Sequence, residues 1–304
     1  MTFKEIIEEI YVKVKNLDSK GQLATYIPEL ANVDPEKFGV YISTVDQFGF
    51  GIGDCNNKFS IQSIAKVLSL CLAYQIIGEK IWERLGVEPS GTAFNSLIQL
   101  ETDNGIPRNP FINAGAIVIA DILLSNLENP KEDFLAFVRN IANNPKLNYS
   151  KKIAVSEKNV GFRNVALCNF MKSFGNIKNN PSEVLDFYFD LCSMEMTCKE
   201  LTEVFLFLAN NGRNLSDNTQ VLTKSQSKRI NAIMQTCGFY DESGDFAFKV
   251  GLPGKSGVGG GIVAVHPNQY VIAVWSPKLN KKGNSFKGIG FLEGFTTKSE
   301  LSIF

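Results

Sequence analysis

Residues 59–70 read FSIQSIAKVLSL, and the rest of the chain is organised around this stretch. From Ser60 onward, apolar residues recur with the spacing of a buried helix: Ile61, Ile64, Ala65, Leu68 and Cys71. Ser63 is therefore predicted to lie in the first turn of that helix. Lys66 follows three residues later, on the same helical face and one turn on.

This spacing suits nucleophilic chemistry. A serine hydroxyl needs a neighbour that takes its proton, and a lysine can do so if burial lowers its pKa. First-turn N–H groups have no partner within the helix, so the N–H of Ser63 can bind an oxyanion. The alternative is a capping serine and a lysine whose stem covers apolar surface. The same spacing recurs at Ser225 and Lys228, in the polar run KSQSKR, which we interpret as a solvated helix face.

Length and charge narrow the class of protein. The chain has 304 residues, which is long for one core and suggests two lobes. Lysine plus arginine number 31 and aspartate plus glutamate number 31, so the formal charge is zero. The absence of a basic stripe argues against nucleic acid or an anionic membrane as the partner.

The cellular compartment can be predicted from three features. Six cysteines are scattered without a C-x-x-C pair, as expected of small core residues in a reducing compartment. Residues 1–17 form an amphipathic helix and not a signal peptide. Residues 114–124 are apolar but too short for a bilayer, and they include Asp121. We expect a cytoplasmic protein with no membrane contact.

The order of elements predicts the fold class. Residues 38–43 and 48–52 form a hairpin, residues from about 80 to 237 are nearly all helical, and strands return at 261–265 and 270–275 after one expected to end near Val250. We predict an α+β fold with a mixed, mostly antiparallel sheet, flanked by terminal helices and carrying an inserted all-helical lobe. Residues 1–304 form one catalytic unit, with residues 1–62 and 238–304 as the sheet lobe and 63–237 as the helical lobe. Ser63 would lie at the cleft between them.

A second motif precedes the first late strand. Lys255 and Ser256 lie in the glycine-rich run GLPGKSGVGGGI, whose bare backbone can approach a ligand and present an N–H such as that of Val258. A bulge or tight turn at a sheet edge is the alternative. The spacing of a phosphate-binding loop is absent.

Three polar residues of the helical region are further candidates. The run NGIPRNPFINAGA delivers Asn113 to the start of a helix, where it binds a ligand or caps the helix. Glu157 and Asn164 are two turns apart on one helical face if that helix continues through Gly161.

Two tyrosines are further candidates for the site, and the single histidine is not. Tyr188 and Tyr240 lie in aromatic contexts where core packing is the alternative to a ligand site. His266 is the only histidine, and we interpret it as structural. This excludes Ser-His-Asp triads and histidine metal sites.

Together these motifs resemble known proteins. S-x-x-K on a helix and K-S-G at a late strand resemble the serine β-lactamase and penicillin-binding fold. The phrases FSIQSIAKV, NPFINAGAI and GLPGKSGVGGGI, with the segment 157–164 between the last two, resemble the serine-dependent glutaminase family from about residue 21 to 294.

The resemblance implies a reaction and a set of site residues. Ser63 would attack the side-chain amide of L-glutamine, with Lys66 as its base, and release ammonia and then L-glutamate. The backbone N–H groups of Ser63 and Val258 would form the oxyanion hole. The remaining residues beside the substrate would be Tyr26, Asn113, Glu157, Asn164, Tyr188 and Tyr240, the two last helping to move protons.

This assignment agrees with the chemistry of glutamine. Glu157 can bind its α-ammonium group, and the amides of Asn113 and Asn164 can bind both α-substituents. No metal or cofactor is needed, and the family resemblance implies a homodimer or homotetramer. Lys255 remains an alternative proton acceptor. A non-catalytic glutamine-binding module and a penicillin-recognising serine enzyme remain alternative functions.

Overall fold

The computed structural model describes residues 1–91 and 97–304. Its five-stranded sheet has the order β2-β1-β7-β6-β5, and every neighbouring pair is antiparallel. The strands are β1 (Gly39–Thr44), β2 (Gly49–Gly53), β5 (Gly254–Ser256), β6 (Gly261–His266) and β7 (Tyr270–Trp275). Two short strands, β3 (Phe59–Ser60) and β4 (Glu195–Met196), pair separately. The predicted α+β class with a mostly antiparallel sheet is confirmed.

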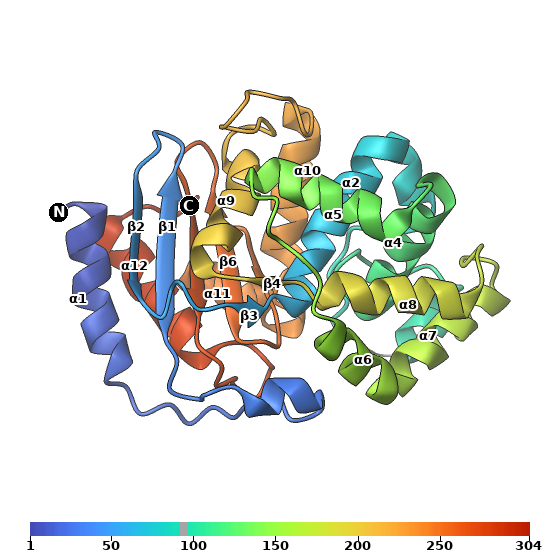
Figure 1. Ribbon diagram of the computed structural model, residues 1–304, viewed down its shortest axis with the longest axis horizontal. Helices are drawn as coiled ribbons and strands as arrows, with labels where there is room; N and C mark the ends of the chain where they lie inside the picture. Colours follow the sequence, from blue (N-terminus) through green and yellow to red (C-terminus); the bar gives the residue numbers. More distant parts are fainter. Residues whose placement is uncertain (92–96) are drawn as a thin grey trace.

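Helices cover both faces of the sheet. The terminal helices α1 (Phe3–Lys15) and α12 (Phe286–Ser299) pack together on one face (Figure 1). On the other face, α9 (Cys198–Ala209) packs against β1, β6 and β7. The inner strands are apolar throughout because side chains alternate between two buried faces: Ile262 and Ala264 contact the core under the terminal helices, and Val263 contacts the other core.

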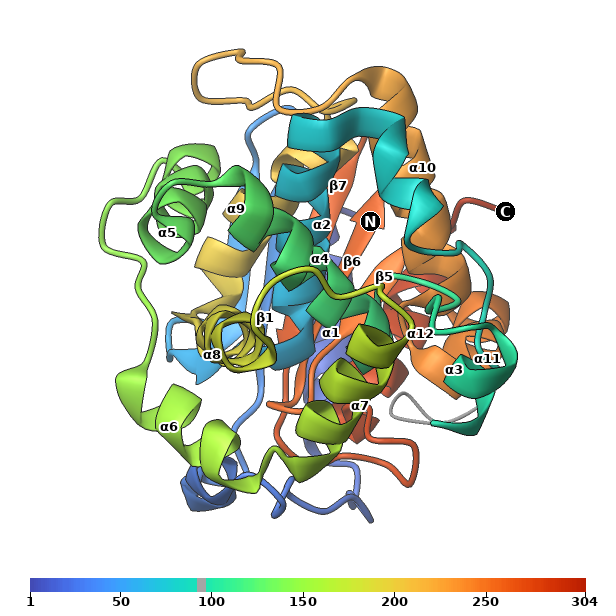
Figure 2. The ribbon, with the colours of Figure 1, turned by 90° about the vertical axis from the view of Figure 1, so that its right-hand side faces the viewer.

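Most of the remaining helices lie on the side away from α1, and Figure 2 shows that side facing the viewer, whereas α11 (Ser243–Lys249) lies beside the sheet and packs Phe246 into the core under the terminal helices. Besides α11, the remaining helices are α2 (Ala65–Ile77), α3 (Ile98–Thr102), α4 (Asn113–Asn126), α5 (Pro130–Ala142), α6 (Lys151–Val160), α7 (Phe162–Ser173), α8 (Pro181–Cys192) and α10 (Lys224–Cys237), with short 3-10 turns at η1 (Pro28–Asn32), η2 (Gln62–Ile64), η3 (Gly78–Glu83) and η4 (Tyr240–Glu242). No described helix is long and apolar enough to cross a membrane.

The helices α2 and α4 form the centre of this region. They pack on each other, and the runs 65–74 and 114–123 are buried on all sides. A helix that is apolar around its whole circumference is stable only where other elements surround it. The stretch around Ser63 is therefore held firmly from its C-terminal side.

Three expectations need correction. The strand expected to end near Val250 is wrong, because α11 occupies residues 243–249 and buries Phe246 against Phe239, with ring centroids 3.6 Å apart. The next strand is instead β5, the Lys255 motif itself. The helix expected to carry both Glu157 and Asn164 is broken at Gly161 into α6 and α7. The predicted start of the Ser63 helix is also early, since α2 begins at Ala65.

Candidate active site

Ser63 lies on the 3-10 turn η2, between β3 and α2. Gln62, just before it, has a φ angle of 48°, a left-handed conformation that costs energy for a residue with a side chain. The turn is held by packing from α2 and by a hydrogen bond from the Gln62 amide to the Ser60 hydroxyl, 3.0 Å long. A strained turn therefore presents Ser63 at the start of a buried helix.

The glycine-rich loop lies directly on this turn. A Cβ atom at Gly257 would lie 2.4 Å from the carbonyl oxygen of Ile61, and one at Gly259 would lie 2.2 Å from that of Ser60. Both positions therefore need glycine for close approach of two backbones. Val258, between them, is brought beside Ser63.

Lys66 and two asparagines form a hydrogen-bonded chain. The Lys66 ammonium group is buried and donates to Asn113 Oδ1 at 2.7 Å and to the Phe111 carbonyl at 3.2 Å. Asn113 Nδ2 donates in turn to Asn164 Oδ1 at 2.9 Å. Asn113 is the first residue of α4 but does not cap it, because its side chain is used in this chain of bonds. The order of donors leaves the Asn164 Nδ2 group as a donor.

Glu157 is a buried carboxylate on α6. Its Oε2 atom has no hydrogen-bond partner among the described residues. Burial raises the pKa of Glu157 to about 7, and the charge of Lys66 and a hydrogen bond with Gln62 only partly offset this. A buried acceptor of this kind is suited to a cationic ligand.

Tyr240 lies between two lysines. The Nζ atoms of Lys255 and Lys66 lie 4.3 and 5.7 Å from its ring centroid, and its hydroxyl is hydrogen-bonded to Ser63 and Lys255. Burial alone would raise the pKa of Tyr240, but the positive charges of the two lysines outweigh burial and lower it. Burial lowers the pKa of the fully buried Lys255 as well. The hydroxyl beside Ser63 is therefore an unusually acidic phenol.

The other two tyrosines differ in exposure. Tyr188, on α8, is buried, and burial together with the nearby Cys192 and Glu157 raises the pKa of its hydroxyl. Tyr26 is about half exposed. Both line the same pocket, although they lie far apart in the sequence.

One pocket of about 280 Å³ gathers these side chains. It is lined by Tyr26, Gln62, Ser63, Asn113, Glu157, Val160, Gly161, Arg163, Asn164, Tyr188, Tyr240 and Val258. Of the predicted site residues, Lys66 is not in the lining and lies behind it, bonded to Asn113. No cluster of metal-ligating side chains is found in residues 1–91 and 97–304.

Two polar lining residues were missed by the sequence analysis. Gln62 supports Glu157, and its only signal was a lone amide in an apolar run next to Ser63. Arg163 precedes Asn164, but an exposed arginine in the sequence has no pattern that distinguishes it from other surface charges.

The chain is similar to glutaminases over nearly its whole length. Residues 21–304 match the family model described as Glutaminase. A glutaminase of Saccharophagus degradans is 60% identical over 302 residues, which cover 99% of this chain and 98% of that protein. A glutaminase of Christiangramia forsetii is 52% identical over 304 residues and covers 100% of both chains.

Solved structures of glutaminases have the same fold as this chain. The probable glutaminase ybaS superposes with a TM-score of 0.94 at 34% identity, covering 99% of this chain and 98% of that one. A probable glutaminase from Bacillus subtilis complexed with 6-diazo-5-oxo-L-norleucine superposes with a TM-score of 0.86 at 31% identity, covering 99% and 94%. The serine β-lactamase-like fold expected from the motifs is the fold of these neighbours.

Proposed function

Because this chain belongs to the glutaminase family, we propose that it hydrolyses the side-chain amide of L-glutamine through a γ-glutamyl ester on Ser63. The protein is an amidohydrolase whose products are L-glutamate and ammonia. The residues that line the 280 Å³ pocket have separate roles in this reaction.

The buried polar groups suit the two charged substituents of glutamine. The unpartnered Oε2 atom of Glu157 accepts from the α-ammonium group, which replaces the solvation lost on burial. The donor end of Asn164 and the exposed guanidinium of Arg163 attract the α-carboxylate. Both substituents are then fixed, and the side-chain amide extends toward Ser63.

Tyr240 is in direct contact with Ser63 and can take its proton. Its hydroxyl is already hydrogen-bonded to Ser63, and its pKa, lowered to about 8, gives the basic phenolate a larger population near neutral pH than an ordinary tyrosine has. Lys66 and Lys255 hold the positive charge that stabilises this phenolate. Direct transfer of the proton to Lys66 remains a second route, and the pH profile of a Lys255→Met variant separates the two routes.

Oxyanion stabilisation comes from the backbone. The 3-10 turn of Ser63 and the loop of Val258 are pressed together by Gly257 and Gly259, so their N–H groups can converge on one carbonyl oxygen. Donors fixed in this way need no rearrangement as charge develops.

The reaction balances in two steps. In the first, the Ser63 oxygen bonds to the amide carbon, the carbon–nitrogen bond breaks, and ammonia leaves with the proton that Tyr240 has taken from Ser63. In the second, water attacks the ester, its proton returns to the Ser63 oxygen through Tyr240, and glutamate leaves. Neither step requires an oxidant or a metal.

The hydrogen bond between Ser63 and a lysine-flanked Tyr240 carries this proposal. It is tested by ammonia release from L-glutamine for the parent and for Ser63→Ala, with L-asparagine as a second substrate. We expect release by the parent and none by the variant, while glutamine still raises the Tm of both. A parent that binds glutamine without releasing ammonia would be a binding module, and a stable adduct with benzylpenicillin would indicate penicillin recognition.

Two coarser properties accompany the reaction. All six cysteines are buried and unpaired, which supports the proposal of a reducing, cytoplasmic compartment. The predicted homodimer or homotetramer stays a prediction, and its test is given in the Discussion.

A further inference from the structure

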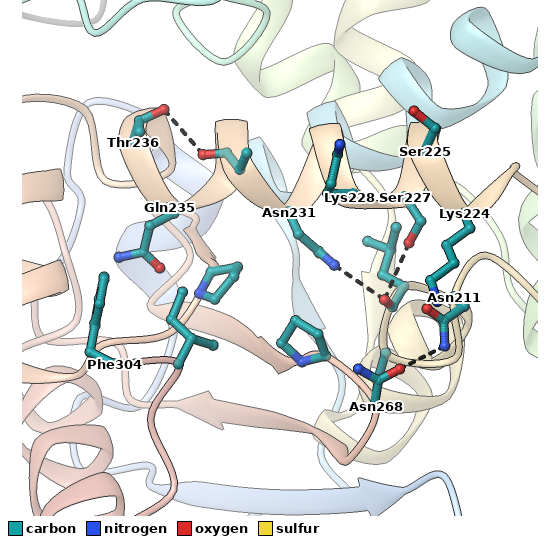
Figure 3. Close-up of a pocket in the computed structure, with 16 residues that line it drawn as sticks. Asn211, Lys224, Ser225, Ser227, Lys228, Asn231, Gln235, Thr236, Asn268 and Phe304 are labelled. Carbon is teal, nitrogen blue, oxygen red and sulfur yellow. Dashed lines mark hydrogen bonds between the residues drawn. The ribbon is translucent and has the colours of Figure 1, made fainter.

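A larger cavity lies away from the Ser63 pocket and shares none of its lining residues. It has a volume of about 830 Å³ and lies between α10, the turn joining β6 to β7, and the C-terminal segment (Figure 3). Cavities of this size bind small organic molecules. The residues that line its two ends differ in charge and polarity.

One end carries an unpaired positive charge. Lys224 is the first residue of α10, where the helix already carries a partial positive charge and the first turn has no acidic residue. Arg229 of the same helix pairs with Glu79, but Lys224 has no ion pair among the described residues. In Figure 3, Lys224 points toward Asn211 and Asn268. This end of the cavity therefore favours an anion.

The middle and the far end hold buried amides. Asn231 is 6% exposed, and its Nδ2 donates to the Leu208 carbonyl at 3.2 Å. Its Oδ1 has no partner in the part of the chain that the structure describes, and neither the Oε1 nor the Nε2 atom of Gln235 has one. Buried amide atoms without partners are rare, because each costs stability until something bonds it. Together these atoms offer two hydrogen-bond acceptors and one donor to the edge of a planar ring in a ligand.

Apolar surface connects the two ends. The lining also includes Ala209, Pro253, Pro267 and, in the C-terminal segment, Ile303 and Phe304, and these residues present few polar atoms. A ligand that fits has an anionic group at one end, a planar edge with N–H and acceptor atoms at the other, and a weakly polar body between.

We propose that this cavity binds a nucleoside monophosphate, with the phosphate at Lys224 and the base edge at Gln235 and Asn231. In such a molecule the phosphate and the base lie at opposite ends, and Gln and Asn amides pair well with the donor and acceptor atoms of a base edge. Lys224 and Gln235 lie about 16 Å apart along the α10 axis, so a ligand bonded to both has its anionic group and its base edge at opposite ends.

Calorimetric titration of the full-length protein with adenosine 5′-monophosphate tests the proposal, with ribose 5-phosphate and inorganic phosphate as comparison probes. We expect saturable binding of one nucleotide per chain, and affinity about tenfold or more weaker for ribose 5-phosphate. Saturating glutamine leaves the nucleotide affinity unchanged, because the two pockets share no residue.

Variants of α10 provide matched controls. Lys224→Gln weakens nucleotide binding about tenfold. Lys228, one turn further along the same helix, also borders the cavity, but its side chain points away from the strands in Figure 3, so Lys228→Gln changes nucleotide binding less than about twofold. Gln235→Leu removes unpartnered amide atoms, so it preserves the fold; it weakens binding of the nucleotide and leaves that of ribose 5-phosphate unchanged.

Four results would overturn the proposal. They are no saturable nucleotide binding up to about 10 mM, equal affinity for the nucleotide and for ribose 5-phosphate or phosphate, equal losses in the Lys224 and Lys228 variants, and occlusion of this face between two copies of the chain in solution. The second of these would leave only a simple anion site.

Discussion

Tyr240 is the residue on which the proposed chemistry depends, because three charged or reacting groups meet at its ring. Its φ angle of 57° holds it in the left-handed region, directly after the buried Phe239. This backbone conformation turns the phenol toward Ser63 and away from the aromatic core. The strain is located where the site needs a fixed orientation.

Removal of Lys255 separates the two proton routes. Lys255→Met takes away the largest of the interactions that lower the pKa of Tyr240, so that pKa rises. If the phenolate is the base, the acidic limb of the kcat–pH profile moves to higher pH by about one unit or more. If Lys66 takes the proton directly, the limb stays close to its position. Lys249→Met, an exposed lysine with an i,i+4 partner, is the control and leaves the profile unchanged.

Glu157 links substrate affinity to pH. The carboxylate must be ionised to bind the α-ammonium group, and its pKa is raised to about 7. We expect kcat/KM to fall as pH drops below about 7, and Glu157→Gln to raise KM about tenfold or more and to remove this limb. An unchanged KM would contradict the assigned role.

Ionisation of Glu157 favours substrate binding but lowers the stability of the folded protein. The folded protein binds the Glu157 proton more tightly than the unfolded chain, so stability falls as pH rises from about 4.5 to 7 and the cost is complete above pH 7. Glu157→Gln should therefore stabilise the ligand-free protein by up to about 3 kcal/mol at pH 8 and by little at pH 5. Thermal unfolding at both pH values measures the difference.

At the scale of elements, the helical region depends on a buried charge in α4. Asp121 accepts a bond from Arg84 Nη2 at 2.5 Å and from the backbone N–H groups of Lys178 and Asn179 at 3.1 and 2.8 Å. Burial alone would raise the pKa of Asp121, but these bonds outweigh it and lower the pKa. One carboxylate thus connects α4 to η3 and to the segment before α8.

Loss of this carboxylate should destabilise the fold strongly. Asp121→Ala leaves the largely buried Arg84 without its ion-pair partner and the N–H groups of Lys178 and Asn179 without their acceptor, so it should lower the free energy of unfolding by about 3 to 5 kcal/mol. Asp245→Ala breaks an exposed pair with Lys249 and should cost less than about 1 kcal/mol. Denaturant unfolding of both variants tests this difference, and equal losses would contradict the structural role of Asp121.

Elements with strong apolar patterns could be predicted from the sequence, and those set by tertiary contacts could not. The strands β6 and β7 and the capping box of Thr197 with Glu200 follow from local residues. The segment 246–250 alternates like a strand but folds as α11, with Phe246 buried and Phe248 89% exposed. The strand β5 is defined by the pairing of Lys255 with Val263, and no local sequence pattern predicts this pairing.

The candidate site divides in the same way. Ser63, Asn113, Glu157, Asn164, Tyr188, Tyr240, Val258 and Tyr26 line one pocket, and the roles that the family resemblance implies for them stay predictions. The left-handed turn at Gln62 was beyond prediction because tertiary contacts hold it, among them the packing of α2 and the close approach of the Gly257 loop. The approach of Lys255 to Tyr240 likewise depends on the register of β5.

On the scale of the whole molecule, the predicted division into lobes remains a proposal. The range 63–237, assigned to the helical lobe, includes α9, which packs on the sheet. We propose that α9 joins the two lobes and that the Ser63 pocket lies where they meet. Hydrogen exchange with and without glutamine would show protection on both sides of that pocket.

Assembly is predicted from family resemblance alone. Light scattering should give a mass of two or four times 33.6 kDa. A monomer at micromolar concentration would contradict the expectation. The Ser63→Ala variant is the control, because loss of the nucleophile leaves the surface unchanged.

The most direct test of the central claim is the intact mass of the protein after acid quench during turnover of excess L-glutamine. A covalent ester on Ser63 predicts a population heavier by one glutamyl group, with the addition located in the peptide that contains Ser63 and absent from Ser63→Ala. Full turnover by the Ser63→Ala variant, or a glutamyl group attached to another residue, would contradict it.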